Sequence, residues 1–127
     1  MLIHKTTDYA IRLLCCLAGA KNPVPSSKLA VELGVSPRYV LHFGAMLREA
    51  GFVQVTGGPA GGFSLARSPE NISLWDVFTC MENGEGLVPT APEDTALGEF
   101  YTMVEEEFRA KLQEMTLKNL CRQKREP

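Results

Sequence analysis

Apolar residues recur at the three- and four-residue spacing of an α-helix along most of this chain, and in one short region they flank a cluster of glycines. The helical segments predicted from this spacing are 8–20, 28–33, 37–50, one opened by Ser73, and 95–115. Segments 52–55 and 63–66 are rich in β-formers on either side of the glycines, so they predict a hairpin. The fold class predicted is mainly α with a small β-hairpin (α+β).

Capping residues and helix breakers set the boundaries of the second and third helices. Ser26 or Ser27 can cap the second helix, and Gly34 ends it. Ser36 is a favoured cap for the third helix, and Pro37 has the backbone dihedral preferred at a first helical position. Two helices joined by a short turn that contains glycine form a helix-turn-helix pattern.

The glycine-rich hairpin that follows this pattern is typical of the wing in a winged DNA-binding domain. In such a domain the third helix enters the major groove, helix N-termini meet phosphates, and glycines let the wing backbone approach the duplex. A hairpin that turns without touching DNA is the alternative. The DNA-binding residues predicted on this basis are Lys5, Thr6, Ser26, Ser27, Lys28, Ser36, Pro37, Arg38, Tyr39, His42, Arg48, Gly58, Gly61 and Gly62.

Two enzymatic interpretations of these residues are disfavoured. A phosphate-binding loop of an NTPase needs Lys-Ser/Thr opening a helix after its last glycine, whereas Phe63-Ser64-Leu65 continues as a strand. His4 and His42 have no Ser, Cys or carboxylate at a spacing that organises catalysis. We therefore expect a protein that is not an enzyme.

The last third of the chain predicts a long amphipathic helix of roughly 30 Å at 1.5 Å per residue. Its apolar stripe is too long to bury on so small a domain, so we expect the seam of a two-fold dimer, with packing on its own domain as the alternative. A dimer would favour a palindromic operator. The predicted interface residues are Leu97, Phe100, Tyr101, Val104, Phe108, Leu112 and Met115.

These elements predict a winged helix-turn-helix domain over 1–82, a linker over 83–94, a dimerisation helix with the short segment that follows it over 95–121, and a tail over 122–127. Ser73 and Asp76 form a capping-box-like start for the fourth helix. Trp75, Val77 and Phe78 on that helix are expected to close over the wing and the first helix.

Composition and charge refine this prediction. The chain has 127 residues, 45% of them hydrophobic, and a net charge of −2. Residues 1–67 hold seven Lys or Arg against three Asp or Glu, a net +4, whereas residues 68–127 hold six against twelve, a net −6. The basic half can face phosphates and the acidic half should point away from DNA, although the acidic residues could also merely solvate surface helices. Neither a bilayer-spanning apolar run nor a signal-peptide pattern is found, so we expect a cytoplasmic protein with no membrane contact.

Five segments, taken in order, resemble the Rrf-type family of bacterial regulators that includes IscR, NsrR and CymR. They are Thr7-Asp8-Tyr9-Ala10, Val35-Ser36, the stretch 47–53, Gly61-Gly62-Phe63 and the stretch 72–77. The resemblance covers nearly the full chain and implies a dimeric winged-helix transcriptional repressor or activator, with repression the expected mode. It also implies that residues 116–120 form the short closing helix of the family. Gly57 stands where the family commonly has an Arg that enters the minor groove, and Leu41 where some relatives have a polar side chain. Both departures imply a different or looser operator preference.

The resemblance also raises the question of an iron-sulfur cluster, which IscR-type and NsrR-type members hold with three cysteines between the fourth and the long helix. Here residues 83–99 (NGEGLVPTAPEDTALGE) contain neither Cys nor His, so we expect no cluster and no other cofactor or metal. Asp8 stands where some cluster-binding relatives supply an oxygen ligand, but one carboxylate cannot hold a cluster.

The four cysteines then behave by default as small apolar residues in a reducing cytoplasm. Cys80 and Cys121 are the candidates for redox thiols. We therefore expect a sequence-specific, dimeric regulator that binds double-stranded DNA without a cluster. The alternative is a regulator with weak intrinsic DNA binding that a thiol switch, a small metabolite or a partner protein controls. The sequence does not identify the operator, the target genes or any effector.

Overall fold

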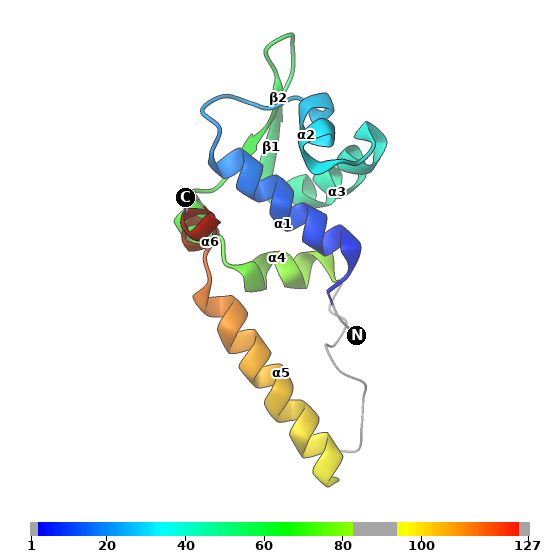
Figure 1. Ribbon diagram of the computed structural model, residues 1–127, viewed down its shortest axis with the longest axis vertical. Coiled ribbons are helices and arrows are strands. Elements are labelled where there is room, and N and C mark those ends of the chain that lie inside the picture. The colour runs from blue at the N-terminus through cyan, green and yellow to red at the C-terminus, as the bar shows by residue number, and fades with distance from the viewer. Residues whose placement is uncertain (1–2, 83–93, 125–127) are drawn as a thin grey trace.

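The computed structural model describes residues 3–82 and 94–124, in which a winged-helix body carries one long projecting helix (Figure 1). The elements in chain order are α1 (Lys5–Ala18), α2 (Ser26–Leu33), α3 (Pro37–Glu49), β1 (Val53–Thr56), β2 (Gly62–Leu65), η1 (Pro69–Asn71), α4 (Leu74–Met81), α5 (Ala96–Glu114) and α6 (Leu117–Lys124). The hairpin lies at one end of the molecule and α5 extends from the other (Figure 1). The predicted class, mainly helical with a two-stranded antiparallel hairpin, is confirmed.

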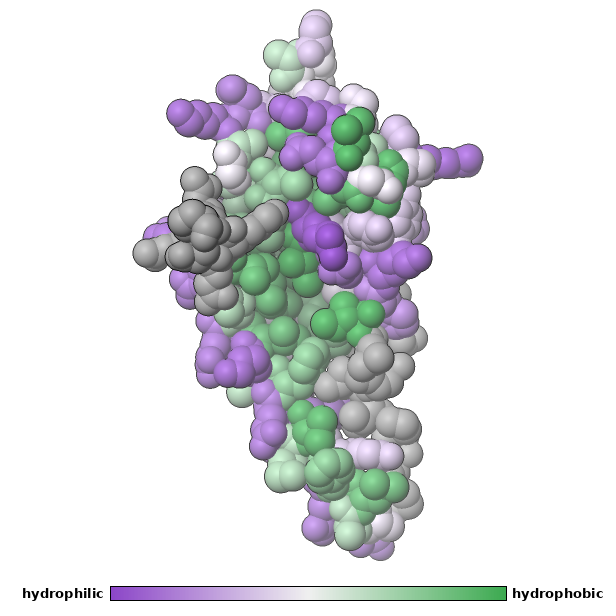
Figure 2. Space-filling model, in the orientation of Figure 1, coloured by the Kyte–Doolittle hydropathy of each residue, from purple (hydrophilic) through white to green (hydrophobic). Residues whose placement is uncertain are grey.

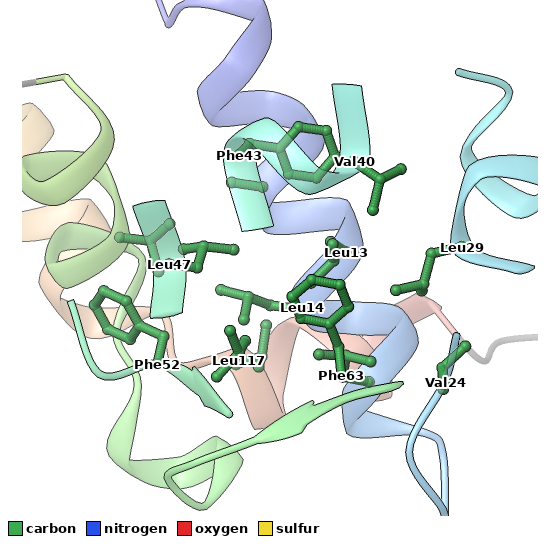
Figure 3. Close-up of a cluster of buried hydrophobic side chains, with 14 of the residues drawn as sticks. Leu13, Leu14, Val24, Leu29, Val40, Phe43, Leu47, Phe52, Phe63 and Leu117 are labelled. Atoms are coloured by element: carbon green, nitrogen blue, oxygen red, sulfur yellow. The ribbon is translucent and has the colours of Figure 1, made fainter. Parts of the chain in front are cut away.

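The core forms around α1, which packs against α2, α3, α4, α6 and β2. Its buried residues Ala10, Leu13, Leu14 and Leu17 follow the helical repeat, so one face of α1 is apolar along its length. Phe43 and Leu47 of α3 and Phe63 of β2 meet this face (Figure 3). Each fully buried Leu or Phe side chain stabilises the fold by about 1.5–3 kcal/mol relative to its exposed state.

The C-terminal helix α6 returns to this core. Leu117, its first residue, is fully buried, and its backbone N–H donates to Ile72 O at 2.8 Å. Leu74 N–H donates to Met115 O at 2.9 Å, so the start of α4 and the end of α5 lie side by side. Helix α6 runs to Lys124, so residues 122–124 of the predicted tail are helical. The predicted linker lies outside the described residues except for its last position.

The hairpin pairs antiparallel, with Val53 opposite Leu65 and Thr56 opposite Gly62, one residue away from the predicted strand limits. The segment before α2 adds an isolated bridge, because Val24 and Phe63 exchange two backbone hydrogen bonds of 2.8 Å. The base of the wing is therefore fixed to the body on both of its sides, by α3 and by this bridge.

Several helix boundaries follow the predicted local signals. Ser36 Oγ accepts the Tyr39 N–H at 3.1 Å, and Gly34 ends α2 with a φ of 71°. Ser73 and Asp76 form a complete capping box at the start of α4. These boundaries are confirmed because the groups that define each one lie within a few residues.

Three expectations about the helices were wrong. Helix α1 begins at Lys5 instead of residue 8. Helix α2 begins at Ser26 with Pro25 in the cap position, so Ser26 and Ser27 lie inside its first turn. Trp75 is only half-buried and faces α5. Its ring stacks on Phe78 of its own helix, with centroids 5.7 Å apart. The Arg109 guanidinium lies 5.2 Å from the same ring. Val77 and Phe78 are buried as expected.

Candidate nucleic-acid interface

The exposed face of α3 is the centre of the candidate interface. Val40, Phe43 and Leu47 point into the core, which leaves the opposite face of the helix to solvent. That face carries Arg38, Leu41, His42, Ala45 and Arg48. The Ser36 cap and Pro37 set the start of the helix, so they fix where Arg38 emerges. The structure thus brings three predicted DNA-binding side chains, Arg38, His42 and Arg48, onto one surface.

Tyr39 has a more internal position than predicted. Its ring meets Tyr9 and Phe43 edge to face, with centroids 5.7 and 5.2 Å apart, and its hydroxyl lies 3.1 Å from Thr6 Oγ1. The ring also stacks beside His42 at 6.3 Å. Thr6 and Tyr39, both predicted to contact DNA, therefore contact each other and connect the start of α1 to the start of α3.

The predicted phosphate-binding residues lie near two helix N-termini. Lys5 begins α1 and is exposed, while Ser27 and Lys28 are exposed in the first turn of α2. Ser26 is half-buried. A helix N-terminus with a lysine beside it favours an anion, because unpaired backbone N–H groups and the helix dipole act together.

The wing glycines separate into two kinds. Gly58 is exposed with a φ of 90°. Gly61 is buried inside the turn, where a Cβ would stand 2.0 Å from Thr56 O, and Gly62 packs its backbone on Val24. Gly61 and Gly62 thus have an internal packing role, and their contact with DNA stays a prediction. Gln54 through Ala60 remain exposed and form the outer part of the wing.

A cavity of about 560 Å³ lies between α3 and the hairpin. Its lining is Ser26, Leu41, Ala45, Arg48, Glu49, Val55, Gly62 and Phe63. Sequence reasoning missed it because the lining comes from α2, α3, β1 and β2, which only the fold brings together. The available signal was Leu41, an apolar residue at an outward position of the helix.

A buried carboxylate, Glu82, was also missed by sequence reasoning. It is 5% exposed at the end of α4, where it accepts hydrogen bonds from His4 N at 2.9 Å and Thr7 Oγ1 at 2.6 Å and pairs with His4 Nδ1. Burial opposes its ionisation, but the hydrogen bonds from Thr7 and His4 and the charge of His4 outweigh burial, so the pKa of Glu82 lies below its usual value. This contact explains the early start of α1, since a negative charge near a helix N-terminus is stabilising.

The predicted dimer stripe divides along α5. Tyr101, Val104, Phe108, Leu112 and Met115 are half-buried, and Phe108 meets Phe78 of α4 with centroids 5.4 Å apart. Leu97 and Phe100 are more than half exposed, and Met103, which was not predicted, is 48% exposed. Figure 2 shows hydrophobic surface continuing from the body onto this projecting helix.

The cysteines lie on three helices: Cys15 and Cys16 on α1, Cys80 on α4 and Cys121 on α6, all half-buried. Burial, with a smaller contribution from the charge of Glu49, raises the pKa of Cys80, which disfavours the reactive thiolate. Asp8 pairs with Arg12 at 3.1 Å on the surface of α1.

These positions bear on the iron-sulfur cluster of the related regulators. A cluster needs several thiolates or imidazoles around one point. In residues 3–82 and 94–124, no group of three or more His, Cys, Asp or Glu side chains is placed to hold a metal ion. Residues 83–99 supply neither Cys nor His. Among the described residues, the thiolate, imidazole and carboxylate groups are therefore not gathered around one point as the ligands of a cluster would be.

Helix α3 after a short turn, followed by a hairpin packed on its flank, defines the winged helix-turn-helix class of DNA-binding proteins. The profile of the Rrf2 family, described as iron-dependent transcriptional regulators, matches residues 3–123. This chain belongs to the Rrf2 family, and it is a winged-helix transcriptional regulator.

Individual relatives agree with this assignment. The chain is 28% identical over 131 residues to Rv1287 of Mycobacterium tuberculosis, a candidate HTH-type transcriptional regulator. The aligned region covers 95% of this chain and 81% of that protein. It is 33% identical over 96 residues to protein rrf2 of Nitratidesulfovibrio vulgaris, covering 74% of this chain and 64% of that protein. The structure of CymR, the global cysteine regulator of B. subtilis, matches with a TM-score of 0.86 at 24% identity, covering 95% and 96% of the two chains. Within the part of the chain described here, no helix is long and apolar enough to cross a membrane.

Proposed function

We propose that this protein is a homodimeric, cluster-free repressor that binds a palindromic operator in the cytoplasm through α3 and the wing. The observation that carries the proposal is the separation of two surfaces along the molecule. Arg38, His42 and Arg48 are exposed on α3, and large apolar residues are exposed on α5. Helix α3 lies toward the end that bears the wing, whereas α5 projects from the other end (Figure 1). One end suits a polyanion and the other suits a second copy.

The charge of the two halves supports this orientation. The half that contains α1, α2, α3 and the wing carries a net +4, and the half that contains α4, α5 and α6 carries a net −6. A duplex placed against α3 meets the basic half and is kept from the acidic half.

The dimer is supported by Leu97, Phe100 and Met103, large apolar side chains that are about half exposed on one helix. A second copy that laid the same helix against them would bury them in an isologous interface. Two α3 helices then lie in successive major grooves of one face of the duplex. Repression requires no further contact, because a dimer seated over a promoter excludes polymerase by occupancy.

The DNA-binding surface is tested with an operator obtained by genome-wide pull-down of bound fragments. Arg38→Ala should weaken binding to the operator more than to random DNA, because its side chain leaves the first turn of α3. Lys28→Ala should weaken binding to both alike and reduce the dependence on salt. Lys118→Ala, exposed on α6, is the control and should leave both affinities unchanged. Equal losses on operator and random DNA for Arg38→Ala would contradict a contact with bases.

The dimer is tested by adding one negative charge to either face of α5. Phe100→Glu should give monomers in sedimentation analysis, because it places a charge among the exposed apolar side chains. Thr102→Glu adds the same charge two positions along, on the opposite and also exposed side of the helix at 3.6 residues per turn, and should stay dimeric. Two variants with the same oligomeric state would count against this interface.

The absence of a cluster is tested on protein purified without oxygen. We expect a colourless protein with no stoichiometric iron, since the chain lacks thiolates grouped as ligands. Stoichiometric iron and sulfide, with visible absorption, would overturn this part of the proposal.

A further inference from the structure

The exposed face of α3 is apolar in its middle and positively charged at its ends. Arg38, Leu41, Ala45 and Arg48 follow one another at steps of three, four and three residues, so they share one face of the helix. Leu41 is 53% exposed, and the exposed Ala45 lies one turn further along. The face therefore runs from a guanidinium through two aliphatic side chains to a second guanidinium.

The hairpin continues this apolar surface. Val55, on β1, is 42% exposed, and it lines the same cavity as Leu41 and Ala45. The buried ring of Phe63 also contributes to the lining, while Ser26, Arg48 and Glu49 supply its polar part. The apolar groove thus lies between the helix that enters the major groove and the strand that carries the wing.

The occupant can be identified from what the major groove offers. Three of the four bases present only hydrogen-bond donors and acceptors at that edge, whereas thymine adds an apolar C5-methyl group. Leu41 and Ala45 can satisfy no donor or acceptor, so a polar base edge pressed against them would lose its water without gaining a partner. A methyl group gains burial at the same place.

We propose that Leu41 and Ala45 recognise thymine methyl groups in the operator, with Val55 closing the side of the groove. The thymines lie in the middle of each half-site, between the base pairs that face Arg38 and Arg48. This inference rests on the proposed function, because it requires α3 to enter the major groove. Leu41 would then favour thymine over the other bases, a preference that a polar side chain at this position would not provide.

The test removes the methyl group and nothing else. Each thymine of a half-site is replaced in turn by deoxyuridine, symmetrically in both half-sites, which keeps the base pair and its O4 acceptor. For the wild-type full-length protein we expect about a fourfold loss of affinity per half-site at one or two central positions, the value for burial of one methyl-sized group. Other thymines should be insensitive.

The affinities for the same duplexes are then measured with two variants, Leu41→Ala and Val31→Ala, each of which shortens one aliphatic side chain. Leu41→Ala should bind the thymine and the uracil operators alike, because the side chain that contacts the methyl group is shortened. Val31→Ala is the matched control, since Val31 is 82% exposed on α2 and does not line the groove. It should keep the wild-type ratio of the two affinities. Both side chains are exposed, so the fold should be retained in both variants, which circular dichroism checks.

The outcomes distinguish a failure of this inference from a failure of the proposed function on which it rests. Wild-type protein that binds its operator specifically, yet tolerates uracil at every position, overturns methyl recognition and leaves the proposed function standing. Sensitivity to uracil that persists in Leu41→Ala also overturns the role of Leu41. A protein with no preference for any DNA sequence overturns both.

Discussion

Gly62 packs its backbone on the Val24 segment where the wing meets the body, and its replacement by Ala tests how the wing is held. Its φ is 147°, in a region that residues with a side chain rarely adopt. A Cβ at this position would stand 2.4 Å from both C and O of Val24. Because these atoms belong to the backbone, relief requires the Val24 segment to move away from β2.

The cost has two parts. The backbone strain at Gly62 amounts to about 1–3 kcal/mol. Displacing Val24 breaks its two hydrogen bonds with Phe63, each 2.8 Å long, and these contribute about 0.5–1.5 kcal/mol each. Gly62→Ala should therefore lower the free energy of unfolding by about 2–6 kcal/mol, a large share of the roughly 5–15 kcal/mol typical of a domain.

Substitutions at two other wing glycines separate the cost of backbone strain from the cost of displacing Val24. Gly58 has a φ of 90°, and among the described residues no heavy atom lies within 4 Å of a Cβ placed there, so Gly58→Ala should cost only the strain of about 1–3 kcal/mol. Gly57 has neither a positive φ nor a described neighbour within 4 Å, and its substitution should change stability by about 0.5 kcal/mol at most.

The assay is urea unfolding followed by the fluorescence of Trp75, the only tryptophan of the chain, at one fixed protomer concentration. Destabilisation should rise in the order Gly57, Gly58, Gly62. Equal losses for Gly58→Ala and Gly62→Ala would refute the reasoning, because the contact with Val24 would then contribute nothing.

Three further predictions follow from particular contacts. Ser36→Ala should cost about 1 kcal/mol in the same assay because it removes the α3 cap, whereas Ser26→Ala, inside the first turn of α2, should cost less than half as much. Because the pKa of Glu82 is lowered in the fold, its carboxylate stabilises the protein above the unfolded value of about 4.3, and this contribution is lost as the pH falls through the folded pKa. Glu82→Gln should flatten the stability profile below about pH 5, and an unchanged slope would contradict the assignment. Cys80 should react with iodoacetamide more slowly in the native protein than in urea at pH 8, since its pKa is raised, and equal rates by mass spectrometry would contradict this.

The features that the sequence predicts correctly are those whose physical cause is local. Ser36 with Tyr39, Gly34 after α2, and Ser73 with Asp76 each place cause and effect within four positions. The start of α1 differs because it depends on Glu82, which is 78 positions from His4 in the chain. Capping by such a distant carboxylate leaves no trace in the pattern around residues 4–8.

The packing of the C-terminal helix on the core also depends on contacts that are distant in the sequence. Helix α6 has the sequence LKNLCRQK, which is polar apart from two leucines and a cysteine, and only the resemblance to the family predicted a short closing helix there. Leu117 is nevertheless fully buried, and its N–H bonds to Ile72. The long helix α5 begins at the end farthest from the body and runs back toward it (Figure 1), and the turn at Met115 and Thr116 pairs with the start of α4 before α6 begins. The return depends on tertiary pairing that periodicity does not encode.

For the candidate site, the sequence identifies residue types but not the relation between α3 and the wing. Gly44 lies where α3 meets β2, and a Cβ there would stand 2.8 Å from Phe63 Cζ, so this glycine sets how closely the two elements approach. The Val24 bridge holds β2 from its other side. The width of the groove beside Leu41 is therefore fixed by buried contacts of Phe63, a residue that need not touch DNA. Operator preference should then respond to changes in the core as well as on the surface, because the groove is formed by packing.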